Sequence, residues 1–182
     1  CYRSYRLQAR CVFDMFASFL STRGGERAQP MLLVRSSAVT PMWILPLECM
    51  KLAVGTSTFS CCKLNHSERR CFRPIACNLM CEMIDGRVRR LFNEDMKVEA
   101  RLTVSLKQFW LRGFTVFKSN TIRTMDTFKN VLQWDSESSY FDRGGLSILI
   151  YAAMSNETSV VRDILSTMND QDKNKCLRAC IP

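Results

Sequence analysis

Residues 144–165, which read GGLSILIYAAMSNETSVVRDIL, constrain the fold more than any other part of the chain. The apolar run LSILIY alone would fit a buried strand, but that interpretation leaves the following AAMSN without a role. Ser147 is a favourable N-cap for a helix that begins at the next residue. Asn156 suits a left-handed turn, after which Thr158 or Ser159 can cap a second helix. The segment therefore predicts two short antiparallel helices joined by a turn.

Apolar residues predict one buried face on each of these helices. In the first helix the face comprises Leu149, Ala152 and Ala153, and the two alanines would allow the second helix to approach closely. The second helix has apolar residues at spacings of 3, 4 and 7, namely Val161, Ile164, Leu165 and Met168. Gly145 allows the positive φ that a tight turn before the first helix needs. We expect a packed helix–turn–helix unit.

The order of these residues matches a known repeat pattern over residues 142–168. The matching positions are Asp142, Gly145, Leu149, Ala152, Ala153, Val160, Val161 and Leu165, with Ser147 in place of Thr and Ile164 in place of Leu. The segment resembles an ankyrin repeat, whose unit reads Asp-x-x-Gly-x-Thr-Pro-Leu-His-x-Ala-Ala-x-x-Gly followed by Val-Val-x-x-Leu-Leu. It departs from the pattern with Ile148 for Pro, Ile150 for His and Asn156 for Gly.

A weaker copy of the same pattern precedes this unit at an offset of 32 residues. Residues 113–135 align with it through the pairs Gly113–Gly145, Thr115–Ser147, Phe117–Leu149, Phe128–Val160 and Leu132–Ile164. Asn120 and Thr121 stand where the two alanines should be, so this segment is either a degenerate or capping unit or an ordinary helix that precedes the repeat. No new Gly-x-Thr-Pro-Leu follows residue 169. Because one repeat cannot bury its own apolar faces, the chain needs such a neighbour.

The resemblance implies a binding scaffold and not a catalyst. Carried over by position, the partner-facing residues of the hairpin tip and the first helix are Arg143, Gly144, Leu146, Met154 and Ser155. We expect a protein partner, no cofactor and no small-molecule substrate. The sequence also contains a single histidine and no Gly-rich phosphate loop or serine elbow, so we do not expect an enzyme.

Helical spacing also predicts elements upstream. We expect helices over residues 6–21, 75–92 (with a weak point at Gly86) and 94–111, whereas residues 31–62 could form strands or remain irregular. In the third helix an amphipathic stripe comprises Met96, Glu99, Leu102, Leu106, Phe109 and Trp110. The predicted class is mainly α, with an N-terminal region that is helical plus irregular or poorly ordered.

Charge divides the chain unevenly. Residues 1–112 contain 18 Lys and Arg against 9 Asp and Glu, whereas residues 113–182 contain eight of each. Such a shift favours a boundary, and we predict a basic region over 1–75, an amphipathic helical segment over 76–112 and a repeat region over 113–182. The arginines are dispersed and the aromatic residues form no stacking surface, so we do not expect nucleic-acid binding.

Ten cysteines offer an alternative function, a small zinc-binding module in residues 61–81. Cys62 and His66, and likewise Cys77 and Cys81, have ligand-like spacing, so these four residues could form a site. The usual two-residue gap is absent, and buried or spare thiols are the other interpretation. Arg69, Arg70 and Arg73 would lower the pKa of nearby thiols and make some of them reactive.

The location of the protein is predicted from what the sequence lacks. The longest uncharged run, residues 36–47, has 12 residues and two prolines, whereas a transmembrane helix needs about 18 or more apolar residues. No signal peptide is recognisable, since Arg10 and Asp14 interrupt the first apolar run. We expect reduced thiols and a cytoplasmic protein. Because the chain begins with Cys1, we expect a fragment of a longer protein.

Overall fold

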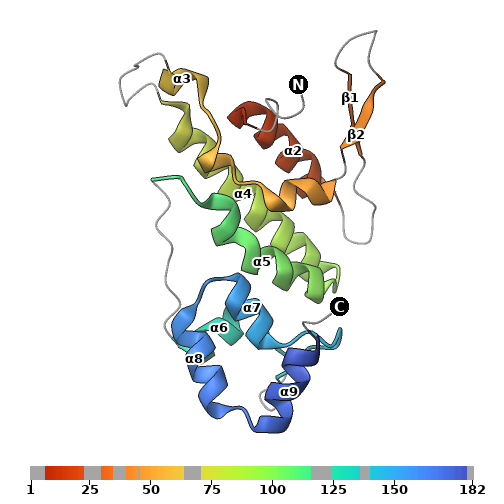
Figure 1. The fold of residues 1–182 in the computed structure, drawn as a ribbon, viewed down its shortest axis with the longest axis vertical. Coiled ribbons are helices and arrows are strands. Elements are labelled where there is room, and N and C mark those ends of the chain that lie inside the picture. Colours follow the sequence, from red (N-terminus) through yellow and green to blue (C-terminus); the bar gives the residue numbers. More distant parts are fainter. Residues whose placement is uncertain are drawn as a thin grey trace.

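The computed structural model describes residues 7–22, 30–34, 40–44, 46–63, 71–115, 124–135 and 140–179. Their helices and strands follow the order α2 (Ala9–Ser21), β1 (Met31–Leu33), β2 (Met42–Ile44), η1 (Pro46–Lys51), η2 (Val54–Thr56), α3 (Ser60–Lys63), α4 (Phe72–Asn93), α5 (Lys97–Leu111), α6 (Met125–Val131), α7 (Ile148–Met154), α8 (Thr158–Thr167) and α9 (Asp170–Ala179). The prediction of a mainly helical fold is confirmed (Figure 1). None of the described helices has the length and apolarity needed to cross a bilayer.

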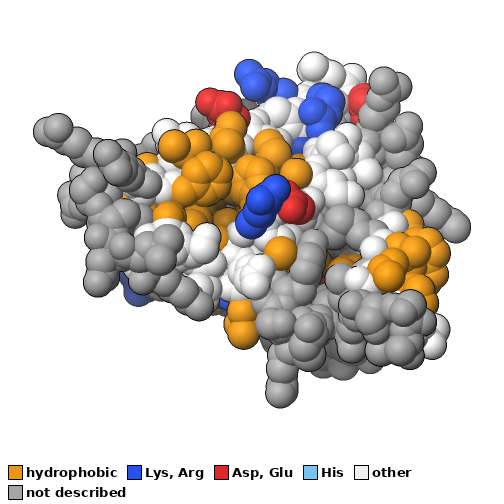
Figure 2. All heavy atoms as spheres, turned by 90° about the horizontal axis from the view of Figure 1, so that it is seen from above, with side chains coloured by type: hydrophobic (Ala, Val, Ile, Leu, Met, Phe, Trp, Pro, Cys, Tyr) orange, Lys and Arg blue, Asp and Glu red, His pale blue; other side chains and the backbone are white. Residues whose placement is uncertain are grey.

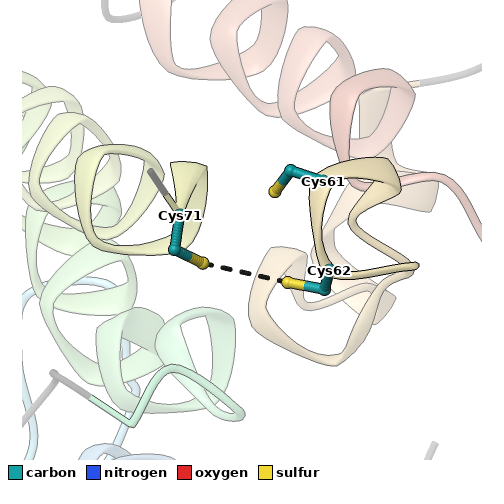
Figure 3. Close-up of side chains that lie close together, drawn as sticks. All are labelled: Cys61, Cys62 and Cys71. Atoms are coloured by element: carbon teal, nitrogen blue, oxygen red, sulfur yellow. Dashed lines mark hydrogen bonds between the residues drawn. The ribbon is translucent and has the colours of Figure 1, made fainter. Parts of the chain in front are cut away.

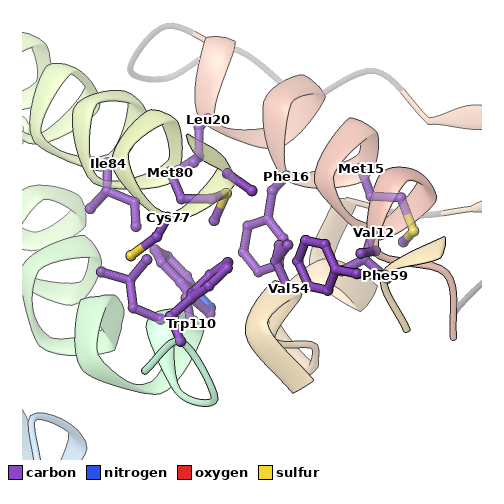
Figure 4. Close-up of a cluster of buried hydrophobic side chains, with 14 of the residues drawn as sticks. Val12, Met15, Phe16, Leu20, Val54, Phe59, Cys77, Met80, Ile84 and Trp110 are labelled. Atoms are coloured by element: carbon purple, nitrogen blue, oxygen red, sulfur yellow. The ribbon is translucent and has the colours of Figure 1, made fainter. Parts of the chain in front are cut away.

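Helix α2 packs on α4 and α5 and forms the first hydrophobic cluster (Figure 4). Its buried face includes Val12, Phe16 and Leu20, which are spaced four residues apart and therefore lie on one side of the helix. The ring of Phe16 meets that of Trp110 edge to face at a centroid distance of 5.6 Å. This cluster also contains Val54 and Phe59 and, from α4, Ala76, Cys77, Met80 and Ile84, so it crosses the boundary predicted at residue 75.

Residues 31–62 contain both strands and short helices. β1 and β2 pair antiparallel, with Met31 opposite Ile44 and Leu33 opposite Met42. The 3-10 helices η1 and η2 follow, and η2 reaches the end of α5 through a close backbone contact. A Cβ atom on Gly55 would lie 2.6 Å from the carbonyl oxygen of Arg112, and Gly113 beside it has a φ of +86°. Only glycine fits at this crossing.

Helices α4 and α5 are adjacent and form the centre of the molecule (Figure 1). α4 continues through Gly86, and a turn with Asp95 at a φ of 58° separates it from α5. The deepest residues of α5 are Ala100, Arg101, Thr103, Ser105, Trp110 and Leu111, whereas most of the predicted stripe is only partly buried. The difference arises because α5 is covered on two sides, by α4 and by α7.

The second hydrophobic cluster lies in the C-terminal part of the chain. Its buried members are Phe128, Leu132, Ile148, Tyr151, Ala152, Val160, Ile164, Met168 and Cys176, from α6 to α9. Leu102 and Val104 of α5 pack against it, whereas Leu106 and Trp110 of the same helix belong to the first cluster. Helix α5 is therefore shared by both clusters.

Candidate functional site

The residues that the sequence assigned to partner binding lie in the loop before α7 and at the C-terminal end of α7, next to the helix pair α7–α8. Its start is fixed by Gly145, whose φ is +79°, and by Ser147, whose Oγ accepts a hydrogen bond from the backbone N–H of Leu149 at 3.1 Å. Asn156 has a φ of 58° and turns the chain between the two helices. The predicted cap, turn residue and helix pair are thus confirmed as local structure.

The predicted buried faces of the pair are rotated by about one position. In α7 the buried residues are Ile148, Tyr151 and Ala152, whereas Ala153 is exposed. In α8 they are Val160 and Ile164, whereas Leu165 is 41% exposed. Positions i, i+3 and i+4 of a helix share one face, and in α7 the buried face is the one that contains Ile148 and not the one that contains Leu149. The prediction that both alanines lie between the helices was therefore wrong.

Helix α8 also begins differently from the prediction. Its N-cap is Glu157, which makes no side-chain capping hydrogen bond, in place of the predicted Thr158 or Ser159. The Glu157 side chain instead accepts a hydrogen bond from Gln108 Nε2 at 3.0 Å. This bond joins the turn of the helix pair to α5.

Asp142 organises the loop that leads into α7. Its side chain is fully buried. One carboxylate oxygen accepts a hydrogen bond from the backbone N–H of Leu146 at 2.9 Å, and the other accepts one from the Tyr151 hydroxyl at 2.6 Å. Burial, followed by the adjacent Asp142 carboxylate, raises the pKa of Tyr151. The tyrosine therefore remains a neutral donor that holds the hairpin tip against α7.

Arg101 of α5 joins this loop to the end of α6. The side chain is 1% exposed, and its guanidinium donates to the carbonyl oxygens of Leu132 and Gln133 at 3.0 and 2.6 Å. It also donates to Asp135 at 3.1 Å and lies 3.9 Å from Asp142 Oδ2. Hydrogen bonds from Lys97 and Arg101 favour the charged form of Asp135, so its pKa is lowered. Sequence periodicity missed Arg101, because it lies outside the predicted apolar stripe, where an arginine is expected to be a surface residue.

The five residues predicted to face a partner differ in their exposure. Arg143 and Gly144 are exposed, and Leu146 and Met154 are partly exposed. Ser155 is 5% exposed, and its Oγ donates to the carbonyl oxygen of Tyr151 at 2.8 Å. Ser155 is the C-cap of α7 and lies one turn after Tyr151, so it presents little surface to a partner.

A second candidate site consists of three cysteines (Figure 3), on elements at the end of the molecule away from α7 and α8 (Figure 1). Cys61 and Cys62 lie on the single turn of α3, and Cys71 is the N-cap of α4. Their sulfur atoms all lie within 4.8 Å of one another, and those of Cys62 and Cys71 are 3.8 Å apart. No disulfide joins the cysteines in the described part of the chain.

The four ligands predicted for zinc do not form one group among the described residues. His66 lies outside those residues, and Cys62 groups with Cys61 and Cys71. Cys77 is instead buried at 3% exposure in the first hydrophobic cluster, against which Cys81 packs. Cys77 and Cys81 are four residues apart and therefore both lie on the core side of α4. The same spacing suits a pair of metal ligands, so the sequence alone could not distinguish the two roles.

The predicted lowering of thiol pKa values is also wrong for the described cysteines with resolved shifts. Loss of water around the sulfur, together with the neighbouring thiols, raises the pKa of Cys62 to about 11. Burial raises that of Cys77 to about 11 as well. Arg73 is engaged elsewhere, since its Nη2 donates to the carbonyl oxygen of Gly55 at 2.8 Å and its guanidinium stacks on Phe59.

A pocket of about 580 Å³ adjoins the cysteine cluster. Its walls come from the start of α2, from residues 58–61 and from the first turns of α4, and Cys61 is one of the lining residues. Hydrophobic side chains gather on this end of the molecule (Figure 2), and Phe72 at the pocket is 48% exposed. The cysteine cluster is therefore accessible to small solutes.

Comparisons of the chain with protein-family models, with curated proteins and with solved structures found no match.

Proposed function

We propose that residues 113–179 form an ankyrin-type helical scaffold that binds another protein and performs no chemistry. The observation that carries the proposal is the helix pair α7–α8. In it a positive φ at Gly145, a side-chain cap at Ser147 and a left-handed turn at Asn156 occupy the positions that the repeat pattern requires. Such helix pairs bury their apolar faces by stacking on neighbours.

The preceding segment supports a second, degenerate unit. Gly113 has a φ of +86°, as its counterpart Gly145 has one of +79°. Phe128 and Leu132 are buried in the same cluster as their counterparts on α8, and α6 contacts α8 directly. Equivalent helices of the two units thus lie side by side, which is the arrangement expected of stacked repeats. The first helix of this unit would fall on residues 116–123, which lie outside the described residues.

The binding surface that we propose comprises Arg143, Gly144, Leu146 and Met154. Asp142 fixes the loop that presents it, through the hydrogen bonds to Leu146 and Tyr151. A surface held in one conformation loses little entropy on binding, so a short loop can contribute usefully to affinity.

Affinity capture with paired variants tests this function. The wild-type chain, Arg143→Glu, Met154→Lys and the control Arg89→Glu are immobilised separately, and captured proteins are quantified by mass spectrometry. Arg89 is exposed on α4, away from the proposed surface. We expect a defined set of proteins to be lost by the first two variants and retained by the control. Equal capture by all four chains would contradict the proposal, provided that circular dichroism shows each variant to be folded.

A further inference from the structure

We propose that Cys61, Cys62 and Cys71 bind one Zn²⁺ ion through their three thiolates. The geometry of the sulfur atoms carries the inference. A zinc–sulfur bond of about 2.3 Å in a tetrahedron places sulfur atoms about 3.8 Å apart. The Cys62 and Cys71 sulfurs have this separation, and no pair in the group exceeds 4.8 Å. The widest pair would close by at most about 1 Å, which side-chain rotation can supply.

The elements that carry the cysteines, α3 and the start of α4, also support a metal site. α3 is one helical turn of four residues, too short to be stable by itself. Cys71 is the N-cap of the 22-residue helix α4 and makes no side-chain capping hydrogen bond. The positive end of the helix dipole favours a negatively charged group at that position. A bound metal would therefore link the single turn of α3 to the start of α4.

The described part of the chain supplies three thiolate ligands to this site. Zinc in proteins is normally four-coordinate, so three thiolates leave one position to be filled by a ligand from outside this cluster. Cys62 is exposed and Cys61 lines the pocket of about 580 Å³, so a small ligand can reach the cluster. Soft thiolate ligands select zinc over magnesium or calcium.

Cobalt and zinc titration of the full chain tests the proposal. The chain is reduced, freed of metal with a chelator and titrated with Co²⁺ without oxygen, and Zn²⁺ is then added. We expect one Co²⁺ per chain, tetrahedral visible bands, a thiolate-to-cobalt charge-transfer band from three sulfurs, and stoichiometric displacement by Zn²⁺. The absence of saturable binding, or a reduced chain that binds no metal but forms a Cys62–Cys71 disulfide in air, would overturn the proposal.

Cysteine variants identify the ligands. Cys61→Ser and Cys71→Ser should each weaken binding more than about 100-fold, because loss of even an outer-shell partner commonly weakens metal affinity 10- to 100-fold. The matched controls Cys77→Ala and Cys81→Ser should retain binding within about threefold. If Cys71→Ser fails to fold, Cys62→Ser decides the question, since Cys62 is exposed. Equal losses in the controls would overturn the assignment, while the α7–α8 proposal would be unaffected.

Discussion

Replacement of Arg101 by Met tests the contact that joins α5 to the C-terminal cluster. Methionine keeps an apolar stem of similar length, so packing against the Trp134 ring, which lies 4.8 Å from the guanidinium carbon, is largely preserved. The guanidinium and its hydrogen bonds are lost. Two carbonyl oxygens, those of Leu132 and Gln133, and the buried Asp142 carboxylate then lose a donor or an opposite charge.

The expected loss of stability follows from this list of partners. Removing one member of a buried ion pair destabilises a protein by about 3–5 kcal/mol, because the other charge remains buried without compensation. For a chain of this length each kcal/mol lowers the melting temperature by about 2–4 °C, so the variant should melt roughly 6–20 °C lower. The free energy of unfolding of an ordinary domain is about 5–15 kcal/mol, so this loss would be a large part of the total stability.

Urea denaturation followed by circular dichroism measures the effect, with Arg89→Met as the matched control. Arg89 is exposed on α4, so its replacement should change the free energy of unfolding by less than about 0.5 kcal/mol. Arg101→Lys keeps the charge but loses the planar fork and should fall between the two. If Arg101→Met matched the control, the buried network would not hold the two parts together and the reasoning would be refuted.

Three further predictions follow from the burial of single positions. Ala152→Asp should lower the free energy of unfolding in urea by at least about 3 kcal/mol, because it buries an unpaired charge. Ala153→Asp, on the exposed side of the same helix, should change that free energy by less than about 0.5 kcal/mol. Gly86→Ala should stabilise the chain by about 0.5–1 kcal/mol, because a Cβ there meets only Arg90 Nη1 at 4.0 Å. Gly55→Ala should destabilise it by about 1–3 kcal/mol, because a Cβ there would lie 2.6 Å from the Arg112 carbonyl oxygen. Calorimetry that found Gly86→Ala destabilising or Gly55→Ala stabilising would contradict these contacts. In the reduced, metal-free chain, alkylation of Cys62 should accelerate about tenfold per pH unit from 7 to 10, because only the thiolate reacts and the Cys62 pKa is raised to about 11. At pH 7 the reaction should be about 100-fold slower than for a thiol with the ordinary pKa of 9.0. A plateau of the rate near pH 8, followed by mass spectrometry, would exclude this pKa.

The sequence predicted the parts of the fold that depend on neighbours in the chain. Gly145, Ser147 and Asn156 each serve a local need, a positive φ or a cap, and all three were assigned correctly. The same holds for the existence of α2, α4 and α5, whose apolar residues recur at helical spacing. Such features need no knowledge of what the helix packs against.

Features that depend on distant parts of the chain were not predictable in this way. Apolar spacing cannot fix the rotation of a short helix to within one residue, so Ala153 was placed inside although Tyr151 takes that role. Arg101 is buried only because carbonyls and carboxylates from residues 132–142 converge on it. Cys71 joins Cys61 and Cys62 because α3 and α4 meet in space, whereas ligand spacing had favoured Cys77 and Cys81.

The sharing of α5 between the two hydrophobic clusters governs how the protein can be divided for experiments. Its Leu106 and Trp110 serve the first cluster, while Leu102 and Val104 serve the second. A truncation after residue 112 would leave a bare apolar stripe on one product and remove one wall of the core from the other. Expression of either half should therefore give aggregation, unless α5 is included in both. In the intact chain the two hydrophobic clusters should unfold together, in a single thermal transition.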